Sequence, residues 1–139
     1  MEALKKNNRT VINLHSEFFS SLMCYYGLDG RCYGVCYKES SDPEEFPTGG
    51  PPGGPLPKYY FKELKTKMGK VEAAVAIKEL PSLKCSCQIC ASQLDFMMDA
   101  ATPDVESRDL MKRHFLISRK EEKDYICNNT LTQALEELQ

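Results

Sequence analysis

Residues 84–90 read KCSCQIC, and His114 follows 24 positions after the last of these cysteines. Three thiols within six residues can surround one ion only if the backbone turns tightly, and the small Ser86 permits that turn between Cys85 and Cys87. Zinc binds four such ligands in a tetrahedron, most often thiolate sulfur and imidazole nitrogen. We therefore predict one structural zinc ion, bound by Cys85, Cys87, Cys90 and His114.

The fourth ligand must come from another part of the chain, and a predicted helix supplies it. Thr102, followed by a proline and an aspartate, is typical of a helix start. A helix from there to about Phe115 places His114 on the same face as Leu110 and Met111. Such a histidine is by itself more often a core residue, but together with three clustered cysteines it favours a metal site. With four protein ligands the site is closed, which is typical of a structural zinc.

The cysteine count and the chain start indicate a reducing compartment. Seven cysteines is an odd number, whereas a secreted disulfide scaffold would use an even set in a shorter chain. The start, MEALKKNNRT, has no apolar run behind its lysines, so no secretory signal is expected. No stretch approaches the ~18–20 apolar residues of a membrane span. We expect a cytoplasmic protein without membrane contact.

The earlier cysteines form a competing set. Cys24, Cys32 and Cys36 could make a second site with His15, but their spacing matches no compact zinc pattern. Burial in the core is the favoured interpretation for these three. Cys127 lies on the last predicted helix, where it is expected in the core or lightly exposed.

The predicted fold is α+β: a small, α-rich domain stapled by the zinc site. Residues 1–39 are expected to form a helix and strand layer, with a helix from Ser16 to Gly27 and a strand over 31–38. Residues 40–57 hold six of the eight prolines and are expected to form a loop. Residues 58–139 are expected to form a helical zinc-binding module.

Within that module, residues 58–80 favour one or two helices, with a possible break at Gly69 and a stop at Pro81. Ser118 with Glu121 predicts a capping box that begins a further helix. Asn128 and the asparagine after it are expected to interrupt that helix.

The spacing C-x-C-x2-C-x23-H resembles the zinc site of the tRNA-guanine transglycosylase family, which exchanges guanine for a 7-deazaguanine base. The contexts LPSLKCSCQIC and LMKRHFL look most like the archaeal-type branch of this archaeosine and queuine family and its DNA-modifying relatives. The family typically has Asn-Leu after the histidine; here Phe115 replaces the asparagine and Leu116 keeps the leucine. Upstream, GLDGRCYGVCYKES and PKYYFKELK look like the family's late barrel strand and the following loop.

The resemblance implies the last part of a (β/α)8 barrel, with the zinc module near its carboxyl end. Family members use two aspartates for a covalent double displacement, one of them in an Asp-Ser-Gly-Gly-Phe run. No such run exists here, and 139 residues are fewer than the ~250 of a barrel. We therefore carry over the zinc ligands and no catalytic residue.

Two functions follow as expectations. The first is a non-catalytic zinc-binding subunit or module of a transglycosylase-like system, partnered by a catalytic protein subunit. The alternative is a stand-alone, zinc-stabilised adaptor that binds protein or nucleic acid.

A basic patch could serve contact with tRNA or DNA. On a helix, Lys58, Lys62 and Lys65 would share one face beside an aromatic run, and Arg113 could add to them. The competing interpretation is a solvated face whose aromatic rings turn to the core. The formal net charge of −2 argues against binding by bulk charge alone.

Overall fold

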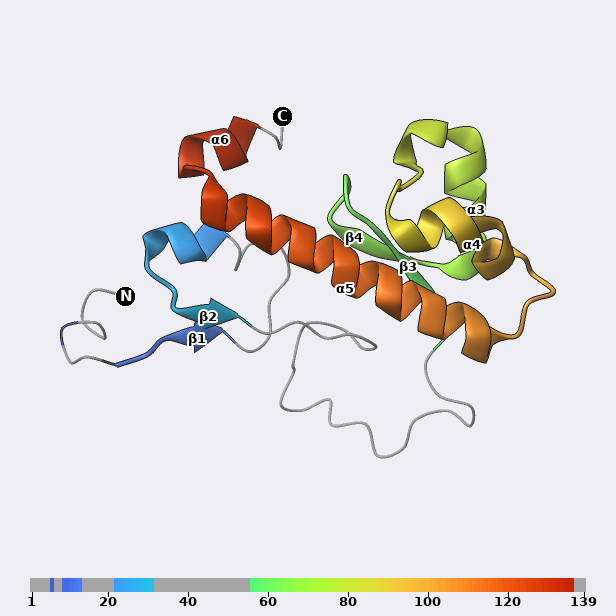
Figure 1. Ribbon diagram of the computed structural model, residues 1–139, viewed down its shortest axis with the longest axis horizontal. Coiled ribbons are helices and arrows are strands. Elements are labelled where there is room, and N and C mark those ends of the chain that lie inside the picture. The colour runs from blue at the N-terminus through green and yellow to red at the C-terminus, as the bar shows by residue number, and fades with distance from the viewer. Residues whose placement is uncertain (1–5, 7–8, 14–21, 32–55, 137–139) are drawn as a thin grey trace. The chain divides into compact units, whose positions relative to one another are not determined.

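The computed structural model describes Lys6 and residues 9–13, 22–31 and 56–136 (Figure 1). The chain divides into two compact units, residues 1–47 with 121–139 and residues 48–120. Small sheets and a majority of helix confirm the predicted α+β class. The likeness to a barrel end and the predicted three-part division remain predictions. Among the described helices, none combines the length and apolar character that crossing a bilayer requires.

An antiparallel hairpin begins the second unit. Strand β3 (Lys58–Phe61) pairs with β4 (Thr66–Gly69), so that Lys58 lies opposite Gly69 and Phe61 opposite Thr66. The aromatic run of β3 suits a pleated surface, where alternate side chains point to opposite faces. Tyr59 and Phe61 join the main core, whereas the buried Tyr60 packs edge-on against Phe115.

The helix predicted over residues 58–80 is therefore wrong in its first half and confirmed in its second. Helix α3 (Lys70–Glu79) begins directly after Gly69, at the predicted break. Pro81 then opens the short 3-10 helix η2 (Pro81–Leu83), which confirms the predicted stop. The helical interpretation failed because aromatic residues favour a strand more strongly than lysine spacing favours a helix.

Two helices follow, α4 (Gln88–Met98) and α5 (Asp104–Asn128). The carbonyl of Pro103 accepts hydrogen bonds from the amides of Glu106 and Ser107. Helix α5 therefore starts one residue later than expected from Thr102 as the residue that caps it. Its end at Asn128 confirms the predicted interruption.

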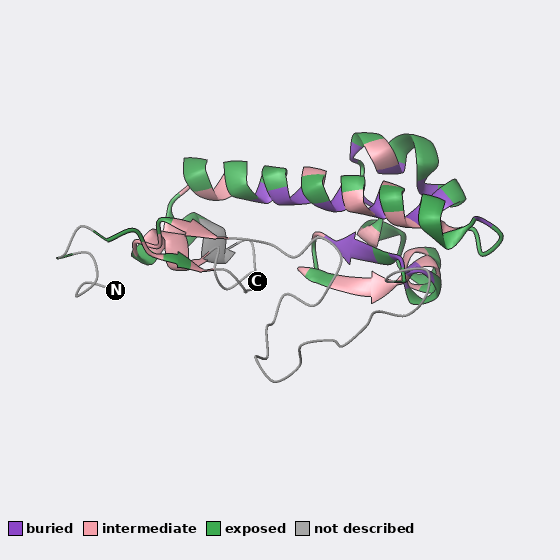
Figure 2. Ribbon diagram, turned by 90° about the horizontal axis from the view of Figure 1, so that it is seen from below, coloured by how far each residue is buried: buried purple, intermediate pink, exposed green. Residues whose placement is uncertain are grey.

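The separate helix predicted from Ser118 is wrong, because α5 continues without a break. Residues 104–128 contain neither glycine nor proline, so nothing in the sequence ends the helix near Phe115. The Ser118 side chain is fully buried, which prevents it from serving as an exposed helix cap. Figure 2 shows the buried side of α5 turned toward the hairpin. That side carries Ser107, Met111, His114, Phe115 and Ser118.

The first unit contains short elements. Strands β1 (Ile12–Asn13) and β2 (Gly30–Arg31) pair in parallel. The 3-10 helix η1 (Cys24–Tyr26) ends at Gly27, whose φ of 93° confirms the predicted stop. Helix α6 (Leu131–Glu136) starts with a capping box, because Thr130 and Gln133 bond reciprocally to each other's amides.

Several predicted features lie outside the described residues. These are the helix start at Ser16, the predicted strand beyond Arg31 and all but the last two residues of the segment 40–57.

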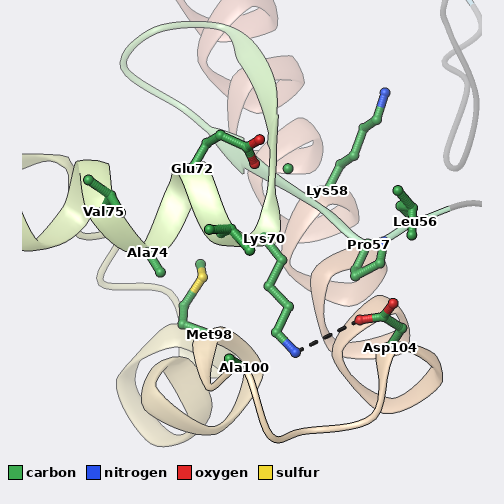
Figure 3. Close-up of a pocket in the computed structure, with 12 residues that line it drawn as sticks. Leu56, Pro57, Lys58, Lys70, Glu72, Ala74, Val75, Met98, Ala100 and Asp104 are labelled. Carbon is green, nitrogen blue, oxygen red and sulfur yellow. Dashed lines mark ion pairs between the residues drawn. The ribbon is translucent and has the colours of Figure 1, made fainter.

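Lys70 anchors the start of α3 to the connection between α4 and α5 (Figure 3). Its side chain is only 8 % exposed, and its ammonium group donates to the Thr102 carbonyl at 2.8 Å. The carboxylate of Asp104 lies 4.0 Å from the same nitrogen. A buried cation at a helix N-terminus is unfavourable, so these two oxygens must offset its desolvation.

We expect Lys70→Ala to lower the free energy of unfolding by about 2 kcal/mol, because the buried Thr102 carbonyl then loses its donor. Urea denaturation measures the change. Lys78→Ala, at an exposed position of the same helix, is the matched control and should stay within ~0.5 kcal/mol of the parent. Equal effects for both variants would contradict an anchoring role for Lys70.

Candidate metal centre

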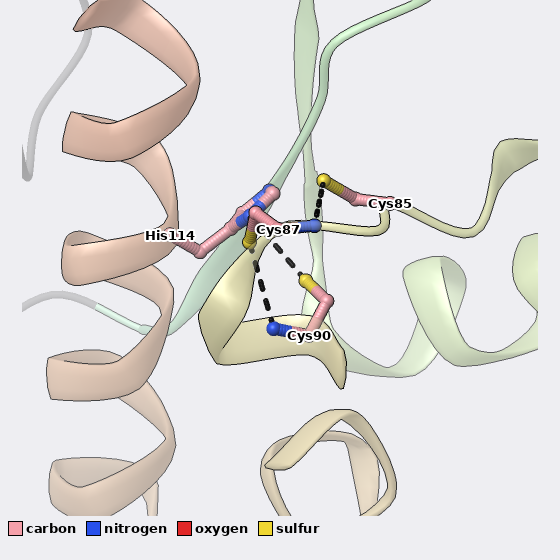
Figure 4. Close-up of side chains that lie close together, drawn as sticks. All are labelled: Cys85, Cys87, Cys90 and His114. Atoms are coloured by element: carbon pink, nitrogen blue, oxygen red, sulfur yellow. Dashed lines mark hydrogen bonds between the residues drawn. The ribbon is translucent and has the colours of Figure 1, made fainter. Parts of the chain in front are cut away.

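Three local structures place the four predicted ligands together (Figure 4). Cys85 lies between η2 and α4, Cys87 is the N-cap of α4, and Cys90 lies in its first turn. His114 reaches toward them from α5. All four side chains are buried, and their ligand atoms lie within 4.8 Å of one another. The four residues are therefore clustered and could hold a metal ion.

Each cysteine sulfur has a hydrogen-bond partner. The amide of Cys87 donates to Cys85 Sγ at 3.4 Å, and the amide of Cys90 donates to Cys87 Sγ at 3.5 Å. The third sulfur, Cys90 Sγ, lies 3.3 Å from the hydroxyl of Tyr59. Two of these sulfurs also sit at the N-terminus of α4, where the helix dipole favours negative charge. These donors and the helix dipole would share the negative charge of thiolates once a metal ion is bound.

The ring of His114 is held in one orientation and one tautomer. Its Nε2 lies 2.7 Å from the carbonyl oxygen of Tyr60. A carbonyl only accepts, so Nε2 carries the proton and donates it, which leaves the lone pair on Nδ1. Nδ1 lies 3.3 Å from Cys87 Sγ and 3.4 Å from Cys90 Sγ. The nitrogen that faces the thiols is therefore the one able to bind a metal.

Burial works against the thiolate form when no cation is present. It raises the pKa of Cys90 well above that of an ordinary thiol, although the hydrogen bond from Tyr59 lowers it. Burial likewise raises the pKa of Cys85. Metal binding must then release protons from these thiols, and the positive ion offsets the charge that remains.

Two of the ligand separations can be compared with those of a tetrahedral zinc site. With zinc–sulfur bonds of about 2.3 Å and zinc–nitrogen bonds of about 2.0 Å, tetrahedral ligands lie roughly 3.5–3.8 Å from one another. The two sulfur–nitrogen separations, 3.3 and 3.4 Å, are close to that range. The four ligand atoms together lie within 4.8 Å of one another, so the most widely separated of them would move closer when they bind one ion. Three thiolates and one imidazole are also the donor set that zinc prefers.

The lysines predicted for nucleic-acid contact do not share a helical face. Lys58 lies exposed in β3, whereas Lys62 and Lys65 lie in the turn between the strands. Arg113 is exposed on α5. The aromatic run beside Lys58 is fully buried and offers no ring for stacking on a base, as the competing interpretation predicted. That these four residues bind nucleic acid remains a prediction, but the single helical face on which it was based does not exist.

The other described cysteines, Cys24 and Cys127, are not members of this cluster. Cys24 is half-buried in η1, which is less burial than predicted, and Cys127 is exposed near the end of α5. Cys32, Cys36 and His15 fall outside the described residues.

Sequence reasoning missed Tyr59 and Tyr60 as site residues. It placed both in a helix, where neighbouring side chains point about 100° apart. Reading KYYF as a strand would have placed Tyr59 on one face and Tyr60 on the other. Only the fold shows that one contributes its ring and hydroxyl, and the other its backbone carbonyl.

No family model, curated protein or solved structure matches the chain. The assignment of the centre therefore depends on its own geometry and chemistry.

Removing one ligand should remove the metal. We expect Cys87→Ser and His114→Ala each to lose most of the bound zinc and at least about 3 kcal/mol of unfolding free energy, because binding energy at a closed site is folding energy. Native mass spectrometry gives zinc per chain, and chemical denaturation gives stability. Cys127→Ser is the matched control at an exposed thiol and should keep both. Full zinc and full stability in either ligand variant would refute the ligand set.

Proposed function

We propose that this chain is a non-catalytic zinc-binding subunit or module of a tRNA-guanine transglycosylase-like system, which exchanges a 7-deazaguanine base into tRNA or DNA. The observation that carries the proposal is the convergence of three thiols and one imidazole nitrogen in a buried cluster. The spacing of these ligands along the chain, which resembles that of the transglycosylase zinc site, supports the choice of this family.

The role of the ion in this proposal is structural. Four protein ligands complete a tetrahedron, so no position remains for water or substrate. The ion would join the segment before α4, the first turn of α4 and the middle of α5. In this chain the residues around it bind and orient the ion and exclude water, because all four ligands are buried.

An exposed apolar groove supports a protein partner, which the subunit interpretation requires. The groove encloses about 450 Å³ (Figure 3). It lies between the start of the hairpin, α3, the C-terminal end of α4 and the N-terminal end of α5. Among its lining residues, Leu56 is 73 %, Val71 67 % and Val75 55 % exposed. Exposed apolar side chains that gather in one place are typical of surfaces that pack against a partner protein.

The alternative is a stand-alone zinc-stabilised adaptor that binds protein or nucleic acid. A closed zinc site and a groove for a protein partner suit both roles, so base exchange by the native assembly is what separates them. An adaptor that needs no catalytic partner should be monomeric and stable while this apolar surface faces water.

The test is a base-exchange assay on the tagged chain purified under native conditions from its own cells. Incorporation of labelled guanine into tRNA or DNA is measured for the co-purified assembly and for the same preparation made with Cys87→Ser. We expect exchange in the first, little in the second, and none from the recombinant chain alone. If the chain is loaded with zinc but its native assemblies incorporate no labelled guanine into tRNA or DNA, the transglycosylase role is refuted. The adaptor role then remains.

A further inference from the structure

We propose that Tyr59 is a positioning residue of the metal centre, whose hydroxyl donates to the Cys90 thiolate and whose ring fixes the plane of the His114 imidazole. The inference rests on the proposed zinc centre and concerns a residue that is not itself a ligand. Tyr59 lies 31 positions before Cys90 in the chain and belongs to a different element.

Two separate contacts from one side chain support this role. The hydroxyl of Tyr59 lies 3.3 Å from Cys90 Sγ, in a fully buried position. Its ring stacks on the imidazole of His114 with centroids 4.4 Å apart and planes within 3° of parallel. The same tyrosine therefore touches the ligand of α4 and the ligand of α5, and it holds both relative to the hairpin.

Charge balance explains why a donor is needed at Cys90. One divalent ion with three thiolates and a neutral imidazole carries a net charge of −1 in a buried place. Backbone amides donate to the sulfurs of Cys85 and Cys87. A metal-bound thiolate has no proton and can only accept, so the phenol of Tyr59 is the donor to Cys90. All three sulfurs then share their charge with a donor.

The backbone next to Tyr59 completes the arrangement. The carbonyl of Tyr60 accepts a hydrogen bond from the Nε2–H group of His114, and such a partner sets the tautomer and the basicity of a ligating histidine. Because alternate side chains of a strand point to opposite faces, the Tyr60 ring packs on Phe115 while the Tyr59 ring faces the centre. The two adjacent tyrosines thus offer a test residue and a matched control.

The experiment compares Tyr59→Phe with Tyr60→Phe in the full chain, loaded with zinc or with cobalt. Tyr59→Phe keeps the stacked ring and removes only the donor. We expect zinc affinity, measured by competition with a chromophoric chelator, to fall about tenfold or more. The sulfur-to-cobalt charge-transfer band should move to longer wavelength, because a thiolate without its hydrogen bond is a better electron donor.

A second readout locates the effect on one sulfur. Alkylation of the zinc-loaded chain by iodoacetamide, mapped by peptide mass spectrometry, should become several-fold faster at Cys90 in Tyr59→Phe, with Cys85 and Cys87 as internal references. Tyr60→Phe should leave the band and all three rates unchanged, even if it lowers stability. A merely structural tyrosine would change stability without changing the band or the rate at a single cysteine.

Replacing Tyr59 by 3-fluorotyrosine gives the opposite perturbation without removing any atom from the contact. The fluorinated phenol is a stronger donor, so the band should move to shorter wavelength and Cys90 should react more slowly.

The outcomes separate this inference from the proposed centre. Unchanged spectra and unchanged Cys90 rates in both Tyr59 variants, with metal bound, would overturn the role of Tyr59 and leave the zinc centre intact. Failure of the unsubstituted chain to bind either zinc or cobalt would overturn the centre, and this inference with it.

Discussion

The hydrogen bond from His114 Nε2 to the Tyr60 carbonyl is the constraint on which the second unit depends. At 2.7 Å it selects the tautomer and directs Nδ1 at two cysteine sulfurs. For this bond to form, the hairpin must bring a strand carbonyl against the middle of α5, and α5 must stay helical at least as far as His114, its eleventh residue. The cysteine segment must then turn tightly enough to place its sulfurs at the same point.

The same cluster also accounts for much of the apolar interior. The core of the described structure includes Cys85, Cys87 and Cys90 together with Tyr59, Phe61, Ala73, Leu94, Met97 and Met111. A third of these positions are thus thiols that interact weakly with one another. The apolar core of a unit as small as residues 48–120 rarely supplies more than about 3–5 kcal/mol of stability, and a structural metal is one way in which small domains add to it. Three of the four ligands are thus core residues as well.

The ligand cluster and the helix ends could be read from the sequence because each depends on local chemistry. Cysteine spacing, Gly69 before α3, Pro81 after it and Asn128 at the end of α5 all act within a few residues. The hairpin and the unbroken α5 could not be read in this way. They depend on burial: the aromatic run of β3 becomes a strand because it packs on both faces, and Ser118 stays helical because its side chain points into the interior. The supporting roles of Tyr59 and Tyr60 depend on that packing as well.

The path of the chain between its ligands has a consequence for the unfolded ensemble. One ion that joins Cys90 to His114 would close a loop of 23 intervening residues, which contains most of α4 and the first part of α5. A permanent cross-link that closes a loop of this length lowers the conformational entropy of the unfolded chain, which destabilises the unfolded state by roughly 3 kcal/mol. Unlike a disulfide, this cross-link would survive thiol reductants and yield to chelators. The fold would then depend on metal supply rather than on the redox poise of its surroundings.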